Sequence, residues 1–139
     1  MYRVILMDDR ERLARLEEHF FGNDANFPVV KECCEAEQGF VFEENNSIKA
    51  YLIYKRNVKV KNKIIDFYIV SVGVLEGWQG KGIGVKLIEM LGSGSILLHV
   101  KKNNQTAIHV YKKLGFIAIG QANNFFYKDD GLLFLRAKL

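Results

Sequence analysis

The chain has 139 residues, of which 49% are apolar, and a formal net charge of +4 at pH 7. This length supports one hydrophobic core, and the sequence, with a single proline and no linker-like tract, predicts one domain over residues 1–139. No apolar stretch reaches the roughly 18 to 20 uncharged residues of a membrane span. Acidic residues within positions 8–11 also interrupt the apolar core that a secretory signal needs, so we expect a cytoplasmic protein with no membrane partner.

The two cysteines, Cys33 and Cys34, are adjacent, which makes them poor disulfide partners, and we expect two reduced structural thiols. The excess of positive charge would suit a polyanionic ligand or a nucleic acid. The lysines in residues 55–63 alternate around a predicted hairpin without interleaved aromatic residues, which favours a solvated tip and argues against a nucleic-acid partner. A second group brackets a predicted helix: Lys101, Lys102, Lys112 and Lys113.

The N-terminal part predicts a strand followed by an amphipathic helix. Residues 2–7 are typical of a strand, and Asp8 or Asp9 can cap a helix over residues 10–21. Residues 22–26 break this helix, and Pro28 stops it from resuming. Residues 29–38 fit either a short helix or a loop.

From residue 40 the pattern changes to strands. Residues 40–43, 48–55 and 64–74 predict a three-stranded antiparallel meander with turns at 44–46 and 61–63. Gly73, near the end of the third of these strands, suits a bulge or the close approach of a ligand backbone. The remaining predicted elements are a helix at 83–91 ended by Gly92, a buried strand at 96–100, a helix at 104–114 ended by Gly115, and strands at 116–119 and 132–137.

Four glycines lie in residues 77–84, between a predicted strand and a predicted helix. Such a turn exposes successive backbone N–H groups that can hold a phosphate. The dinucleotide fingerprint fails on spacing, because Val85 or Leu87 stands where its last glycine is needed. A Walker A loop would need a hydroxyl residue after Lys81, and a protein-kinase loop would need later H-R-D and D-F-G segments, which the sequence lacks.

Residues 79–84 (QGKGIG) fit Q/R-x-x-G-x-G/A, and residues 104–116 (NQTAIHVYKKLGF) fit N-x-x-A-x-x-x-Y-x-x-x-G-F. Both segments, in this order, resemble the GNAT superfamily of N-acetyltransferases. The resemblance covers residues 40–139 well and the rest loosely. It implies a mixed α/β (α+β) fold in which a central sheet of six to seven strands is splayed between strands four and five and flanked by about four helices.

The resemblance also implies acetyl-CoA as co-substrate, with no metal. The backbone N–H of Val74 would polarise the thioester carbonyl, and the Tyr111 phenol would protonate the departing thiolate. A phenol with a pKa of about 10 is protonated at neutral pH and can serve a thiolate with a pKa of about 8.5. Lys112 or Lys113 could contact a phosphate. The implied cofactor-binding residues are Val72, Gly73, Val74, Gln79, Gly80, Lys81, Gly82, Ile83, Gly84, Asn104, Ala107 and Tyr111.

The proton acceptor for the attacking amine is open. Many members of the family place a glutamate on the fourth strand, four residues before the position of Val74, but this chain has Val70 there. The candidates are Asp66, Tyr68, Ser71 through a water, and an acid among Glu32, Glu35 and Glu37, which could equally be solvent-exposed.

The histidines, His19, His99 and His109, are expected to be structural or solvated, and no H-E-x-x-H segment indicates a metal. We expect an enzyme that moves acetyl to a primary amine by direct attack in a ternary complex, as a monomer or homodimer. The alternative is a non-catalytic acyl-CoA-binding module of the same fold. Small amines, polyamines and peptide amines all stay open as acceptors, although residues 124–127 with 132–135 resemble enzymes acting on protein N-termini or polyamines.

Overall fold

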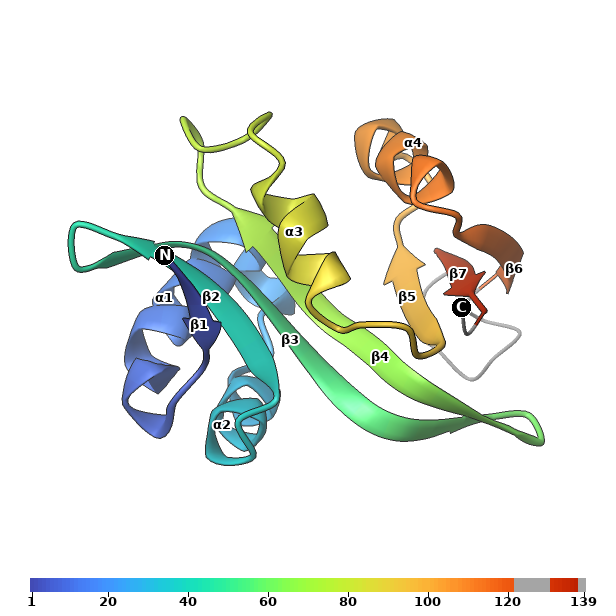
Figure 1. Cartoon of the computed structure of the whole chain (residues 1–139), viewed down its shortest axis with the longest axis horizontal. Helices are drawn as coiled ribbons and strands as arrows, with labels where there is room; N and C mark the ends of the chain where they lie inside the picture. Colours follow the sequence, from blue (N-terminus) through green and yellow to red (C-terminus); the bar gives the residue numbers. More distant parts are fainter. Residues whose placement is uncertain (122–130, 138–139) are drawn as a thin grey trace. The chain divides into compact units, whose positions relative to one another are not determined.

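A computed structural model describes residues 1–121 and 131–137 of the chain (Figure 1). Seven strands are hydrogen-bonded in the order β1-β2-β3-β4-β5-β7-β6. β4 and β5 are parallel, and the pairs β1–β2, β2–β3, β5–β7 and β6–β7 are antiparallel. The elements are β1 (Tyr2–Val4), η1 (Met7–Asp9), α1 (Arg10–Phe21), η2 (Gly22–Asp24), α2 (Phe27–Glu35), β2 (Gly39–Glu44), β3 (Ser47–Val60), β4 (Lys63–Val74), α3 (Ile83–Glu89), β5 (Ile96–Val100), α4 (Gln105–Lys113), β6 (Ile117–Gln121) and β7 (Leu132–Arg136).

This architecture confirms the predicted mixed sheet with four helices. The predicted splay between the fourth and fifth strands is also confirmed. The β4–β5 ladder joins only residues 67–69 to residues 96–98, although β4 continues to Val74 and β5 to Val100.

The chain forms two compact units, and β3 and β4 each run through both. Unit 1 comprises Met1–Tyr54 and Ser71–Gly92, and unit 2 comprises Lys55–Val70 and Ser93–Leu139. That residues 1–139 act as one domain stays a prediction.

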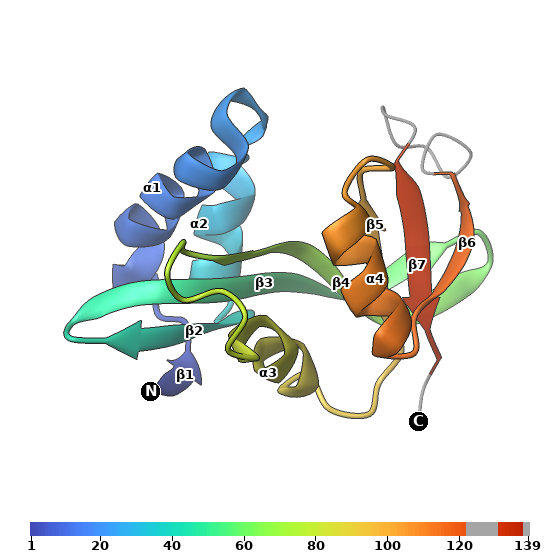
Figure 2. The ribbon, with the colours of Figure 1, turned by 90° about the horizontal axis from the view of Figure 1, so that it is seen from above.

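In unit 1, α1 and α2 lie side by side on one face of β2 and β3, and α3 lies on the opposite face (Figure 2). Leu13 of α1, Val30 of α2 and Leu87 of α3 are each at most 1% exposed. Each of these helices therefore packs an apolar face against the sheet, as its spacing of apolar residues predicts.

In unit 2, the core forms around Ile65, Leu97 and Leu133. β5 is paired on both edges, parallel to β4 and antiparallel to β7. Four of its five residues are buried, which explains its continuous apolar run.

The first strand is shorter than predicted, and neither aspartate caps α1 through its side chain. β1 ends at Val4, and a 3-10 turn occupies Met7–Asp9. Asp9 stands at the N-cap position of α1, but its carboxylate accepts the backbone N–H of Leu6 at 2.8 Å and pairs with Arg3 and Arg12. Ionic partners across the chain therefore take the place of the predicted helix cap.

Segment 29–38, which fits a helix or a loop in the sequence, is helical up to Glu35. Pro28 was expected only to stop the first helix from resuming, but it lies at the start of this second helix. α2 begins at Phe27, with Pro28 in the first turn, where the missing N–H has no helical partner to lose. The side chain of Asn26 accepts the Val29 N–H at 3.2 Å and caps the helix.

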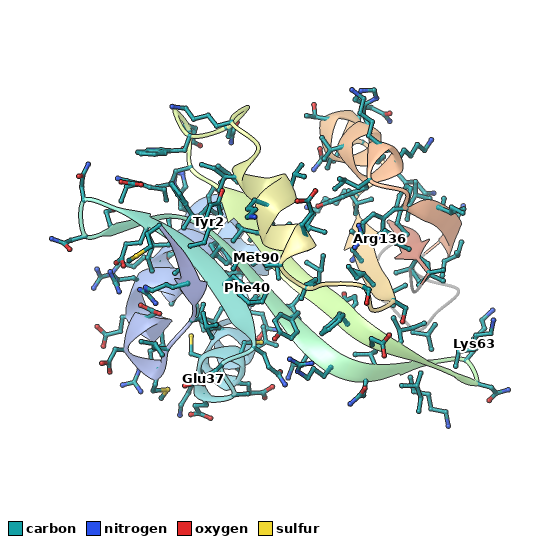
Figure 3. The ribbon with its side chains drawn as sticks, in the orientation of Figure 1. Tyr2, Glu37, Phe40, Lys63, Met90 and Arg136 are labelled. Carbon is teal, nitrogen blue, oxygen red and sulfur yellow. The ribbon has the colours of Figure 1, made fainter. Side chains whose placement is uncertain are left out.

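The hairpin of β3 and β4 is longer than predicted, because β3 continues to Val60. Its turn includes Lys61, which has a φ of 46°, and Figure 3 shows Lys63 beside this turn with its side chain pointing away from the ribbon. The other predicted elements agree with the structure to within one or two residues at each end.

No helix within residues 1–121 and 131–137 is long and apolar enough to cross a membrane. Residues 124–127 lie outside the described residues.

Candidate functional site

The glycine-rich loop of unit 1 joins the end of β4 to α3. Gly77, Gly80 and Gly82 have φ values of 85°, 76° and 79°. A Cβ atom at any of the three would meet nothing within 4 Å, so their backbone conformation, and not lack of space, requires glycine. Left-handed glycines at alternating positions, here Gly80 and Gly82, can turn successive N–H groups to one side, so residues 77–84 are a candidate anion-binding nest.

Trp78 fixes this loop against β2 and β3. Its ring centroid lies 5.9 Å from that of Phe42, and its backbone N–H donates to the Leu75 carbonyl at 3.0 Å. The ammonium groups of Lys49 and Lys81 lie 5.5 and 5.3 Å from the ring centroid, within the range of a cation–π contact. Two positive charges therefore lie at the loop, which favours an anionic ligand.

The end of β4 directs the Val74 peptide groups away from β3. The N–H of Leu75 donates to the Lys49 carbonyl of β3 at 2.9 Å. Neighbouring residues in a strand point their N–H groups to opposite edges, so the N–H and C=O of Val74 face the other edge. There the Val74 carbonyl accepts a hydrogen bond from Gln79 Nε2 at 2.9 Å, which ties the glycine loop to the strand end.

Position 73 requires a glycine for a different reason from the one predicted. A Cβ atom at this position would lie 2.5 Å from Cε2 of Phe20, so the last turn of α1 occupies the space that a side chain would need. The close approach is made by an aromatic ring of the same unit.

Behind this strand end lies a buried polar cluster of Glu17, Tyr51 and Ser71, which are 4%, 0% and 6% exposed. The Tyr51 hydroxyl and the Ser71 hydroxyl both donate to Glu17 Oε2, the latter at 2.8 Å. Burial and the nearby Glu17 carboxylate raise the pKa of Tyr51, so its phenol stays protonated and acts as a donor. Ser71, a candidate base from the sequence, is thus held by two partners. The sequence analysis missed Glu17, although it lies four residues after Leu13 on the buried face of α1.

In unit 2, Tyr111 lies half-buried on α4. Its ring centroid is 5.8 Å from that of Phe116 in an edge-on arrangement. Burial raises the pKa of the Tyr111 phenol, which therefore carries its proton at neutral pH. This is the protonation state that a proton donor needs.

Asn104 and Ala107 form the N-terminal cap of the same helix. Asn104 Oδ1 accepts the Ala107 N–H at 3.1 Å, so the side-chain oxygen of Asn104 serves the helix itself. His109, Lys112 and Lys113 are exposed on α4.

Four of the candidate bases are either hydrogen-bonded to the backbone or exposed to solvent. Asp66 Oδ2 accepts the backbone N–H of Ser95 at 2.8 Å and its hydroxyl at 3.1 Å, and so holds the start of β5 to β4. The three acids after α1 are exposed, and Figure 3 shows Glu37 at the end of α2, turned outward. These acids are Glu32, Glu35 and Glu37.

Tyr68 and His99 share one face of the sheet. The parallel register places Tyr68 opposite Leu97. Side chains two residues apart in a strand point to the same face, so His99 is on the face of Tyr68, one step along β5. Both are half-buried. The sequence could not pair them, because the register between β4 and β5 is a tertiary property.

Within the described residues, no group of three or more histidine, cysteine, aspartate or glutamate side chains could hold a metal ion. The sheet is splayed between β4 and β5, and a glycine-rich loop follows β4. The family model described as "Acetyltransferase (GNAT) family" matches residues 7–116, so the chain belongs to this family, as the motifs predicted.

Among curated proteins, the chain is 26% identical over 130 residues to an uncharacterized protein of Mycobacterium leprae, covering 81% of this chain and 33% of that protein. It is 24% identical over 126 residues to the N-alpha-acetyltransferase RimI of Mycobacterium tuberculosis, covering 85% and 78%. The chain thus spans about a third of the first of these relatives. Among solved structures, Arabidopsis thaliana Naa50 in complex with the bisubstrate analogue CoA-Ac-MVNAL is similar, with a TM-score of 0.80, 22% identity and coverage of 99% and 97%.

Proposed function

We propose that the protein transfers the acetyl group of acetyl-CoA to the α-amine of a peptide. The observation that carries this proposal is the glycine nest of residues 77–84 tied through Gln79 to the end of β4. Its N–H groups would hold the diphosphate, and Lys81 beside Trp78 adds positive charge. The other residues proposed to bind the cofactor are those expected from the sequence.

The pantetheine arm would lie along the edge of Val72–Val74 that faces away from β3. The Val74 N–H points to that edge and would donate to the thioester oxygen, where negative charge develops during attack. The amine nitrogen forms a bond to the carbonyl carbon, and the carbon–sulfur bond breaks. Tyr111 would give its phenolic proton to the departing thiolate.

The amine must lose a proton during this attack. We place that step on Tyr68 and His99, because the strand register puts a phenol and an imidazole on one face of β4 and β5. The imidazole of His99 can accept a proton at a ring nitrogen, and the Tyr68 hydroxyl can both accept and donate one. Ser71 is hydrogen-bonded to Glu17 and Asp66 to Ser95, and both stay alternative candidates for this step.

The proposed acceptor, a peptide α-amine, is based on the names of the similar proteins. One relative carries the name N-alpha-acetyltransferase, and one structural neighbour holds a bisubstrate analogue in which CoA and acetyl are joined to the peptide MVNAL. A peptide α-amine is therefore favoured over a free polyamine. A cytoplasmic location and a monomeric or homodimeric state stay predictions.

A panel of acceptors tests the class of amine. The protein is mixed with acetyl-CoA and a short peptide with a free N-terminus, the same peptide with a blocked N-terminus and an internal lysine, or spermidine. Free thiol is then measured and the product mass is determined. We expect thiol release with the first acceptor alone. Transfer only to lysine or spermidine would overturn the choice of acceptor, and CoA binding without any transfer would favour the non-catalytic module.

The nest itself is tested by replacing one glycine. Gly82→Ala forces a residue with a Cβ into a φ of 79°, a strain of roughly 1 to 2 kcal/mol, and should weaken acetyl-CoA binding by about tenfold. Gly92→Ala is the matched control, because Gly92 has a similar φ of 81° and open space around it but follows α3, outside residues 77–84. Equal affinities in calorimetry for both variants would count against the nest.

A further inference from the structure

Glu17 is an unusual residue for its place in α1. Leu13, Glu17 and Phe20 lie along the face that α1 turns to the sheet, and Glu17 is only 4% exposed. A carboxylate buried in this position is costly unless it is hydrogen-bonded, and an apolar side chain would fill the space without that cost. The two hydroxyl donors, Tyr51 and Ser71, compensate the burial.

The cluster connects α1 to two strands at once. Tyr51 belongs to β3 and Ser71 to β4, and their hydroxyl oxygens are 3.2 Å apart. Both hydroxyls donate to the same carboxylate oxygen, Oε2 of Glu17. Hydrogen bonds to a charged group are directional and stronger than those between neutral groups, so this contact fixes the position of Ser71 more narrowly than apolar packing would.

Ser71 is three residues before Val74 on the same strand. Ser71 and Gly73 point to the same face, because they are two residues apart. Phe20, one helical turn after Glu17, lies against Gly73. Glu17 and Phe20 therefore contact β4 at successive positions on its α1 face, immediately before the residue whose N–H we assign to the thioester oxygen.

We propose that Glu17 is a positioning residue for the Val74 N–H: its carboxylate holds Ser71 and Tyr51, and thereby keeps α1, with Phe20, against β4 and sets the direction of the strand end. This inference rests on the proposed acetyl transfer for its catalytic meaning. It goes beyond that function in assigning a role to a buried carboxylate that does not touch substrate.

The test compares Glu17→Leu, which keeps the volume but removes both hydrogen bonds, with Glu17→Gln, which keeps an oxygen acceptor. A displaced oxyanion donor should lower kcat by at least about tenfold in Glu17→Leu, since misplacements of this kind reach roughly 100-fold. The Kd for CoA should stay within about threefold, because the diphosphate contacts belong to residues 77–84. Glu17→Gln should recover most of kcat.

Val30→Ala is the matched control, because Val30 is 1% exposed in α2, and its loss destabilises unit 1 while leaving the hydrogen bonds of Glu17 in place. A general loss of stability would lower the folded fraction in Val30→Ala and Glu17→Leu alike and leave kcat per folded molecule unchanged. That result, or full kcat in Glu17→Leu, would overturn the proposal. If Glu17→Leu does not fold, Ser71→Ala removes the same contact from the β4 side, and its kcat decides.

Hydrogen exchange separates this inference from the proposed function. Glu17→Leu should speed exchange of the amides of residues 72–74 relative to Val30→Ala, whether or not the protein transfers acetyl. A wild-type protein that moves acetyl to no amine would refute the proposed function. Unchanged exchange at residues 72–74 in Glu17→Leu would refute the positioning role alone.

Discussion

Unit 1 and unit 2 use polar side chains in different ways. Unit 1 joins them in networks: a partly exposed salt-bridge network of Arg3, Asp9, Arg12 and Glu43, and the buried Glu17 cluster. Unit 2 has an apolar cluster around Leu97 and a buried charged side chain, Arg136. Its proposed proton-transfer groups, Tyr68, His99 and Tyr111, are half-buried on regular elements.

The difference follows from what each region must do. Unit 1 presents backbone N–H groups, in the nest and at Val74, and a backbone can be held only by fixing the elements around it. Buried, directional polar contacts do this. Unit 2 supplies side chains that exchange protons, and such groups need partial exposure. Substitutions in unit 1 should therefore affect stability and geometry, and those in unit 2 should affect chemistry.

The largest effect is expected from Tyr111→Phe in unit 2. Loss of a general acid should lower kcat by about 100-fold or more, while CoA affinity is unchanged because the nest is untouched. Steady-state kinetics and calorimetry measure the two quantities. Tyr2→Phe is a control outside the proposed site and should keep its kcat. A kcat within a few-fold of wild type for Tyr111→Phe would remove the phenol from the mechanism.

The second-largest effect is a loss of stability expected from Asp9→Ala in unit 1. Asp9→Ala removes a carboxylate that is 1% exposed and bound by Arg3 and Arg12 at 2.8 and 2.6 Å. Breaking such a buried pair should lower the free energy of unfolding by about 3 kcal/mol in urea denaturation. Asp8→Ala, one residue away and partly exposed, should change it by less than about 0.5 kcal/mol. Equal losses would show that the network adds nothing to stability.

A smaller effect is expected on the stability of the protein at acidic pH. Burial by itself would raise the pKa of Asp9, but the hydrogen bonds from Arg3 and the Leu6 N–H lower it below its usual value. Because the pKa of Asp9 is lower in the folded protein than in the unfolded chain, its ionised carboxylate stabilises the fold above about pH 4. This stabilisation is lost as the pH falls through the pKa of Asp9 in the folded protein. The stability of wild type should therefore fall more steeply below pH 4 than that of Asp9→Asn. Parallel curves in pH-dependent unfolding would contradict this assignment.

The smallest effect is expected at the cysteines of unit 1. Burial raises the pKa of Cys34 to about 11, and both thiols are 0% exposed. At pH 8 roughly one Cys34 in a thousand would be thiolate, so a thiol reagent should leave native protein unlabelled and acetyl transfer unaffected. Unfolded protein should react at both positions. Rapid native labelling with loss of activity would reopen a covalent route.

Much of the fold could be predicted from the sequence, because its signals are local. The apolar run of residues 96–100 predicted a doubly flanked strand, and the spacing of Leu13 and Phe20 predicted the buried face of α1. The errors lie where a side-chain contact overrides the preference expected from the sequence. Asp9 was expected to cap a helix, but Arg3 and Arg12 recruit its carboxylate, and the residues around Pro28 form a helix because Asn26 caps it.

The candidate site divides in the same way. The glycines of residues 77–84 and Tyr111 could be singled out from the sequence, because glycine spacing and motif order are properties of the linear chain, and their roles stay predictions. The Glu17 cluster, the contact of Phe20 with Gly73, and the shared face of Tyr68 and His99 came only from the tertiary structure. Each depends on strand register or on which helix face meets the sheet, and a one-residue slip of register would turn these side chains to opposite faces.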